Sequence, residues 1–212
     1  PTFDGTFIPQ EGTHMPSIDE NKRKAILKAA LELFSEYGFH NAPMARLADQ
    51  ANVGVGSVYR YFKDKNTLIE TLYEEVDEAL QMAIIDGVDP THSTRKQFLH
   101  LIINLTCFLK DHPHEFKFLE QYYHSPFGIE KKREKLLLEK ISDRQNPFMK
   151  LFFEGSRKEI KSLPVPLLHA LAFGPVLFLL RDAMAGLVKL DEAMIIQLAD
   201  GCWDAIRNRV DS

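Results

Sequence analysis

Residues 38–65 decide the fold of this chain, and they read GFHNAPMARLADQANVGVGSVYRYFKDK. Pro43 suits the first turn of a helix, where its missing N–H is not needed. The apolar residues that follow it at helical spacing are Met44, Leu47, Ala48 and Ala51. Asn52 can adopt the left-handed conformation that a tight turn requires, and a second short helix is predicted over 55–62. Two short helices joined by a tight turn predict a helix-turn-helix.

Further helices are predicted on both sides of this pair. Apolar spacing over 25–37 predicts a longer first helix that ends at Gly38, and 67–85 predicts a long amphipathic helix. Five more helices are expected at about 93–111, 114–124, 129–160, 166–187 and 191–210, with a kink at Pro147 in the third. No segment alternates convincingly at the strand period. The chain is therefore expected to be all-α, with about nine helices.

Three regions are expected along the chain. Residues 1–16 lack periodicity, and His14-Met15 matches a common cloning junction, so a vector-derived or disordered tail is predicted there. Residues 17–66 are predicted to form a three-helix head, and residues 67–212 a larger helical body. The long helix that begins near Thr67 would join the two and act as a lever between them.

Charge is distributed unevenly over these regions. The chain has a net charge of −4, yet 20–66 carries eight basic and five acidic residues, a net of +3 that leaves −7 elsewhere. A basic head on an acidic body is typical of a small DNA reader joined to a sensor or dimerisation domain. Cys107 and Cys202 lack the spacing of a zinc site, so we expect a reduced, cytosolic protein with no metal and no cofactor. The apolar stretch Leu167–Leu180 is shorter than the roughly 20 residues of a membrane span, which predicts a buried helix and no membrane.

The second short helix has chemistry suited to DNA. Its start, Gly54-Val55-Gly56-Ser57, is almost free of bulk, so its backbone could approach a duplex closely. The side chains that follow can donate hydrogen bonds, stack or carry charge: Tyr59, Arg60, Tyr61, Lys63 and Lys65. In a helix-turn-helix the second helix enters the major groove, so double-stranded DNA is the expected partner.

This stretch resembles the DNA-binding signature of the TetR (tetracycline-repressor-like) family of bacterial transcriptional regulators. The matching positions are Leu47, Ala48, Ala51, Val53, Gly56, Val58, Tyr59, Tyr61, Phe62 and Lys65. The resemblance implies backbone contacts or close approaches at Gly56, Ser57, Tyr59 and Lys65. It implies base contacts from Val55 and Arg60, since arginine to guanine is the commonest specific contact. Arg46 and His40 are further phosphate candidates.

The chain departs from the family pattern at its helix caps. Ala42 and Pro43 stand where the family usually has two hydroxyl residues, and Gly54 replaces a capping Ser or Thr. Fewer phosphate contacts than usual in the family are therefore expected. The aromatic residues could pack in the core of the head instead of contacting DNA. We favour core packing for Phe62 and DNA contact for Tyr59, and for Tyr61 the two interpretations are equally supported.

The resemblance implies that the body forms a homodimer through its last two helices. The segment 167–190 is apolar almost all round, and a domain of this size rarely buries a helix on every face. The residues expected at the dimer interface are Leu171, Val176, Leu179, Met184, Ile195, Leu198, Trp203 and Ile206. Two heads related by a two-fold axis would match a palindromic operator.

The resemblance also implies a cavity for a small-molecule effector inside the body. The candidate lining residues are large apolar groups and a few polar ones: Phe98, Ile102, Asn104, Phe108, Phe118, Tyr122, Tyr123, Phe148, Phe152, His169 and Phe173. A pocket lined by aromatic side chains with a few polar groups suits an apolar or flat ligand. Ordinary core packing is the alternative explanation for most of them.

Two functions remain open from the sequence. The first is a homodimeric repressor that a small apolar or aromatic effector releases from a palindromic operator. The alternative is a ligand-free or partner-controlled DNA-binding protein whose body only dimerises. An enzyme is not expected, because no nucleophile–base pair, paired-carboxylate motif or metal spacing is present in the sequence.

Overall fold

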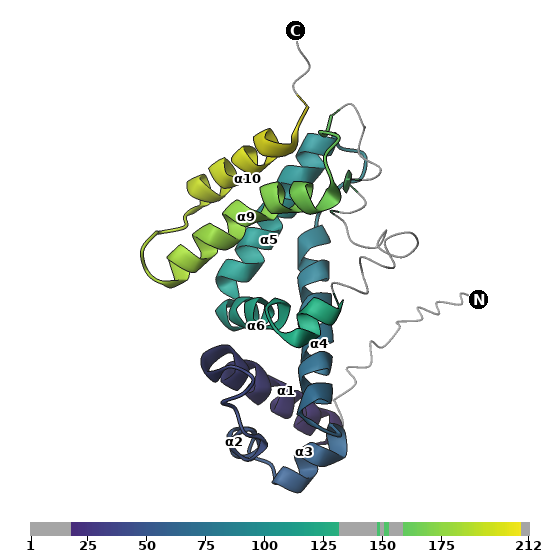
Figure 1. Ribbon diagram of the computed structural model, residues 1–212, viewed down its shortest axis with the longest axis vertical. Helices are drawn as coiled ribbons and strands as arrows, with labels where there is room; N and C mark the ends of the chain where they lie inside the picture. Colours follow the sequence, from purple (N-terminus) through teal and green to yellow (C-terminus); the bar gives the residue numbers. More distant parts are fainter. Residues whose placement is uncertain (1–17, 132–147, 149–150, 153–158, 209–212) are drawn as a thin grey trace, which may run out of the picture.

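The structure is a computed structural model that describes residues 18–131, 148, 151–152 and 159–208 (Figure 1). Its named helices are α1 (Ile18–Tyr37), α2 (Met44–Gln50), α3 (Val55–Tyr61), α4 (Lys65–Ile85), α5 (Thr94–Asp111), α6 (Pro113–Tyr123), α9 (Val165–Met184) and α10 (Glu192–Ile206). Within the described ranges β pairing is limited to one isolated bridge between Ile160 and Arg207. The all-α prediction is therefore confirmed. The expected tail and most of the helix expected at 129–160 lie outside the described residues, although 126–131 is helical.

The head consists of α1, α2 and α3 at one end of the molecule (Figure 1). α1 packs on α2 and α4, and α2 packs on α3. Its core consists of fully buried side chains: Ile26, Ala30, Leu33, Phe34, Leu47, Ala48 and Val58. Gly38 (φ 77°) and Asn52 (φ 53°) take the left-handed conformation, as expected from their turn chemistry. The predicted helix-turn-helix geometry is present.

α4 connects the head to the body and begins at Lys65, slightly before the expected start at Thr67. The reason is its cap: the side chain of Asp64 accepts a hydrogen bond from the Thr67 backbone N–H at 2.8 Å. α4 then runs upward from the head and contacts α1, α5 and α6 (Figure 1). Its buried side chains are Leu68, Ile69, Leu72, Tyr73, Val76, Leu80 and Ile84.

A second connection between head and body runs from α1 to α6. The Phe39 ring packs edge-on against Phe34 of the head at 5.4 Å and against Phe118 of the body at 5.8 Å between ring centroids. The hydroxyl of Ser35 lies 2.7 Å from Nδ1 of His114, and the Gln121 amide donates to the Ser35 carbonyl. The connection between head and body through α4, which the sequence predicted, is thus accompanied by direct packing of α1 on α6. The apolar periodicity of the sequence did not indicate this second contact.

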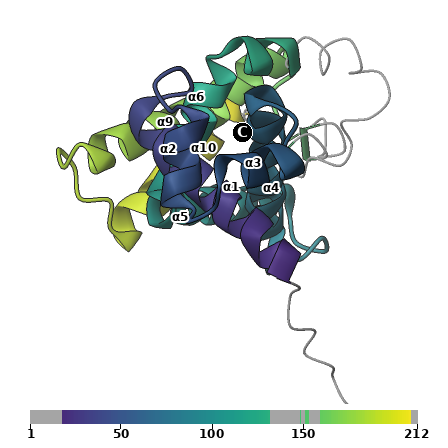
Figure 2. The same cartoon turned by 90° about the horizontal axis from the view of Figure 1, so that it is seen from below.

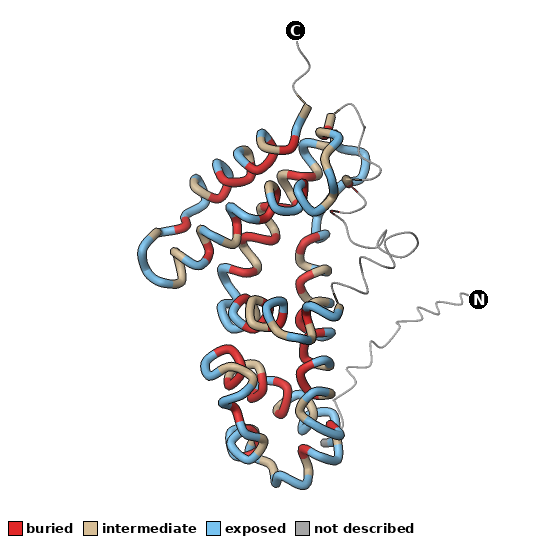
Figure 3. Tube along the Cα trace, viewed as in Figure 1, coloured by how far each residue is buried: buried red, intermediate tan, exposed pale blue. Residues whose placement is uncertain are grey.

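α9 and α10 pack on each other and on α5 at the far end of the molecule (Figure 1). α9 is long and apolar enough to cross a membrane by length and composition, and only 28% of its most apolar window is buried. Phe178 is 61% exposed, and Leu187, just beyond the helix, is 75% exposed. The expectation of a buried helix over 167–180 was therefore wrong for one face of α9. In the part of the chain that the structure describes, α9 packs on α5 and α10, while Phe178 on its other side stays exposed (Figure 3).

Candidate nucleic-acid interface

α3 turns one face to the core of the head and the other to solvent. Val58 and Phe62 are four residues apart, hence on one face, and both are buried. Tyr59 is 50% exposed and Val55 is 39% exposed. Seen from below in Figure 2, α3 lies at the free end of the head. Phe62 is therefore a core residue, as expected, and the outer face of α3 is accessible to a duplex.

The glycines at the start of α3 leave an open surface. A Cβ built on Gly54 or Gly56 would meet no heavy atom of the described chain within 4 Å. Gly54 has an ordinary extended conformation, with φ −68° and ψ 146°. Neither packing nor backbone strain within the protomer therefore explains these glycines. Close approach of another molecule does explain them.

The two short helices begin at residues that carry no capping oxygen. Pro43 is the N-cap of α2 and Gly54 is the N-cap of α3. Ala42, the other position where the family usually has a hydroxyl, is fully buried. Both helices therefore begin without the side-chain oxygen that Ser, Thr, Asp or Asn would supply, and Pro43 has no backbone N–H to donate to a phosphate either.

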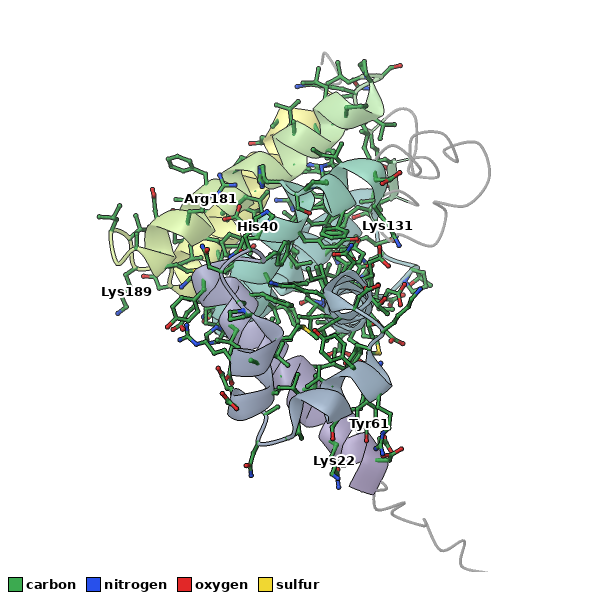
Figure 4. The ribbon with its side chains drawn as sticks, turned by 60° about the horizontal axis from the view of Figure 1, so that its bottom comes forward. Lys22, His40, Tyr61, Lys131, Arg181 and Lys189 are labelled. Carbon is green, nitrogen blue, oxygen red and sulfur yellow. The ribbon has the colours of Figure 1, made fainter. Side chains whose placement is uncertain are left out.

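Arg60 and Tyr61 converge on Asp19 of α1. Arg60 Nη2 donates to Asp19 Oδ1 at 2.6 Å and to the Tyr61 hydroxyl at 2.9 Å, and that hydroxyl donates to the same carboxylate oxygen. Tyr61 raises the pKa of Arg60 most, and Asp19 raises it further, so the guanidinium stays charged. Figure 4 shows Tyr61 near the start of α1. The sequence analysis missed this cluster, because Asp19 lies 41 residues before Arg60 in the chain.

The other predicted phosphate contacts lie elsewhere on the head. The Lys65 ammonium is 5.8 Å from the centre of the Phe34 ring, and partial burial lowers the pKa of this lysine. The Arg46 guanidinium lies over the Tyr37 ring at 4.0 Å, where the ring supports it at the surface. Lys63 is exposed and follows α3 directly.

Comparison with known proteins agrees with this geometry. Residues 26–72 match the family model of bacterial regulatory proteins of the tetR family. Residues 94–207, more than half of the chain, match the model of the tetracyclin repressor-like C-terminal domain. The chain belongs to the TetR family. It is therefore a DNA-binding transcriptional regulator.

Solved TetR-family structures share the whole fold. A TetR family transcription regulator from Marinobacter aquaeolei superposes with a TM-score of 0.79 at 22% identity, over 90% of this chain and 98% of that one. One from Haemophilus influenzae gives 0.73 at 22% identity, over 89% and 97%. Bacillus subtilis FadR, solved with stearoyl-CoA, gives 0.65 at 19% identity, over 85% and 95%.

A curated relative matches part of this sequence. The chain is 34% identical to the HTH-type transcriptional regulator BetI of Escherichia coli over 65 residues, which make up 31% of this chain. The match spans a third (33%) of the length of that relative.

Most residues predicted to line an effector cavity are packed in the TetR body core. Those that are buried are Phe98, Ile102, Phe118, Tyr122, Phe148 and Phe173. Their rings pack on one another: Phe148 meets Phe173 at 4.6 Å between centroids, and Phe98 meets Trp203 at 5.5 Å. In the described residues these side chains serve as core, which was the alternative explanation.

The remaining cavity candidates also have local contacts. The Asn104 amide donates to the carbonyls of Ile84 and Asp86 at 3.0 and 2.9 Å, and so closes the end of α4. Phe108 stacks on His112 at 4.2 Å, and His169 packs on Phe173 at 4.3 Å. Tyr123 is half-exposed and Phe152 is partly buried. Asn104 is therefore a helix-ending residue in this structure rather than a free polar group in a pocket.

An open pocket of about 260 Å³ lies between α4 and α6. Its lining residues are Glu70, Tyr73, Glu74, Tyr122, Phe127, Glu130 and Lys131. Tyr73 and Tyr122 stack at 4.0 Å, and burial raises the pKa of Tyr122 to about 12. Only Tyr122 of this set was predicted from the sequence. The glutamates of α4 are four residues apart on one helix face, and that spacing was the signal that could have indicated them.

The residues predicted at the dimer interface differ in how far the protomer buries them. Five are buried within the protomer, between α9, α10 and α5: Val176, Ile195, Leu198, Trp203 and Ile206. These five belong to the core of the protomer, and the sequence could not separate them from interface residues because apolar periodicity marks a core face and an interface face alike. Leu171, Leu179 and Met184 are only partly buried. The exposed apolar residues of this region are Leu167, Phe178, Leu187 and Ile196.

Proposed function

We propose that this TetR-family regulator is a cytoplasmic homodimeric repressor that a small effector releases from a palindromic operator. The observation that carries the DNA-reading part is the outer face of the segment from Gly54 to Lys65. This face has two glycines with open space in front of them and the charged Arg60. A backbone that can approach DNA closely, followed by a guanidinium, offers both positioning and base contacts. No membrane, cofactor or catalytic step is part of this proposal.

A homodimer explains the exposed apolar face of α9. Phe178 and Leu167 lie on a helix with little burial in the protomer, and exposed apolar patches of this kind mark interaction sites. A second copy would cover the face with an identical one across a two-fold axis. The same axis would place two α3 helices toward successive turns of the major groove, which is the geometry a palindrome requires.

Release by an effector is supported by the position of the α4–α6 pocket. The pocket is lined by α4, by Tyr122 of α6 and by the helical segment 126–131, and both α4 and α6 also contact α1 of the head. A molecule that binds between them and favours a different α4–α6 arrangement would change the orientation of the head. The aromatic rings suit a flat or apolar group, while the three glutamates favour a positively charged one. The stearoyl-CoA in FadR supports only the general idea that this fold accepts apolar effectors.

The DNA-reading part is tested by selecting duplexes from a random pool with the wild type and with Arg60→Ala. The wild type is expected to enrich a palindrome. Arg60→Ala is expected to lose preference at one or two positions in each half-site, with a cost of about 1–3 kcal/mol per base contact. An unchanged preference would show that Arg60 does not read bases. If the selection enriched no duplex from the random pool, this result would argue against sequence-specific binding altogether.

The effector part is tested by a thermal-shift screen followed by operator binding. A compound that binds the folded state raises the unfolding temperature through mass action. We expect at least one class of stabilising compounds to release the operator, and expect Tyr122→Ala to weaken its effect at least tenfold. Compounds that stabilise the protein and leave DNA bound would instead favour the ligand-free or partner-controlled alternative.

A further inference from the structure

We propose that Asp19 is an internal substitute for a DNA phosphate, which holds Arg60 and Tyr61 in the free protein and so suppresses binding to non-operator DNA. The inference rests on the proposed function, because it takes the outer face of α3 as the DNA-reading surface. It adds a residue of α1, outside the helix-turn-helix, that sets how strongly this surface binds any phosphate.

Arg60 and Tyr61 form an anion-binding site, and the carboxylate of Asp19 occupies this site in the free protein. One carboxylate oxygen accepts hydrogen bonds from the Arg60 guanidinium at 2.6 Å and from the Tyr61 hydroxyl. The same guanidinium also donates to that hydroxyl at 2.9 Å, so the three groups form a closed cluster. A phosphate oxygen offers a similar anionic acceptor, and charged donors of this kind serve carboxylate and phosphate alike. The two anions therefore compete for one pair of donors.

Asp19 and the charged residues near it at the start of α1 form different ion pairs. Arg23 pairs with Glu75 of α4 at 2.5 Å, and Lys24 pairs with Glu20 at 3.1 Å. Asp19 thus reaches across to α3, while its neighbour Glu20 pairs within α1. Glu20 is therefore a matched control, since it offers the same kind of charge one residue away.

The pair is weak enough to open when a better acceptor arrives. The side chains of Arg60 and Asp19 are 61% and 68% exposed, and exposed ion pairs contribute little to stability. On operator DNA, Arg60 gains a bidentate base contact that compensates for leaving Asp19. On other DNA it gains only a phosphate in place of a carboxylate. Loss of the Asp19 pair costs the same free energy on either duplex, but only the operator offsets this cost with a base contact, so Asp19 keeps binding to other DNA weak.

The test compares Asp19→Asn and Glu20→Gln, each with Arg60 intact and with Arg60→Ala. Binding is measured to the selected operator and to a shuffled duplex of equal length over a series of salt concentrations. Asp19→Asn is expected to tighten binding to the shuffled duplex and to the operator by a similar factor, about 3- to 10-fold at low salt. The slope of log affinity against log salt for the shuffled duplex should steepen by about 0.9, as for one more neutralised phosphate.

Each remaining outcome decides the proposal. Glu20→Gln should change the affinity for either duplex much less than Asp19→Asn does, and Arg60→Ala should abolish most of the effect of Asp19→Asn. Equal effects of Asp19→Asn and Glu20→Gln would overturn the proposal, because charge alone would then explain them. A full effect of Asp19→Asn without Arg60 would overturn it too. If Asp19→Asn has no effect while Arg60→Ala still relaxes base preference, only the role of Asp19 fails and the proposed function stands.

Discussion

Phe178→Glu is expected to convert the proposed homodimer into a monomer and to lower operator affinity by about 100-fold or more. Phe178 is 61% exposed in the protomer, on the apolar outer face of α9. A carboxylate there costs the protomer little, but in a dimer it would be taken from water without a partner. Each separated head would then bind its half-site alone and would lose the effective concentration that the second head provides. Sedimentation velocity measures the first effect, and titration of labelled operator the second.

Met82→Glu is the matched control for this change. Met82 is 59% exposed, but it lies on α4 rather than on α9 or α10. This variant should remain dimeric and bind operator as the wild type does. A Phe178→Glu protein that still sediments as a dimer at micromolar concentration would place the interface on another surface.

Gly56→Leu is expected to abolish operator binding while it leaves the fold intact. A side chain at residue 56 would project into open space in the free protein, and leucine is a better helix former than glycine. The free energy of unfolding should therefore stay the same or rise by up to about 1 kcal/mol. The same side chain would occupy the space through which the start of α3 approaches DNA, so affinity should fall by about 100-fold or more for operator and shuffled duplexes alike.

Urea denaturation and operator titration of the same preparation separate the two effects. Gly56→Ala should show a smaller loss of affinity with a similar gain in stability. If the Gly56→Leu protein were stable and still bound operator at the wild-type affinity, the N-terminal turn of α3 could not lie against the duplex. A destabilised protein would contradict the open surroundings of this glycine in the structure.

The head could be predicted closely from the sequence because each of its signals is local. Gly38, Asn52 and Pro43 act within one turn of the chain, and Val58 and Phe62 follow the helical period. The predicted DNA-facing residues of α3 lie on its exposed side for the same reason. The missing caps at Pro43 and Gly54 could also be read directly from residue type.

The contacts that could not be predicted join residues far apart in the chain. Asp19 with Arg60, and Phe39 with Phe118, depend on how helices are placed in space, which periodicity does not encode. Which side chains of α9 and α10 are buried could not be predicted either, for the same reason. Val176 and Phe178 are both apolar, yet one faces the protomer core and the other faces solvent. Hydrophobicity alone gives no means to tell a core face from an interface face.

The packed contact between α1 and α6 has a consequence for protein engineering. Sensors are often built by transplanting the DNA-binding part of one regulator onto the ligand-binding part of another. A graft cut at residue 66 would remove Phe39 from Phe118 and Ser35 from His114, and would leave an apolar ring and a polar group without their neighbours. The transferable unit in this protein therefore includes the head, α4 and the α6 surface that Phe39 touches. A chimera that keeps these together should retain communication between ligand and DNA, whereas one cut at the helix-turn-helix boundary should fold as two uncoupled modules.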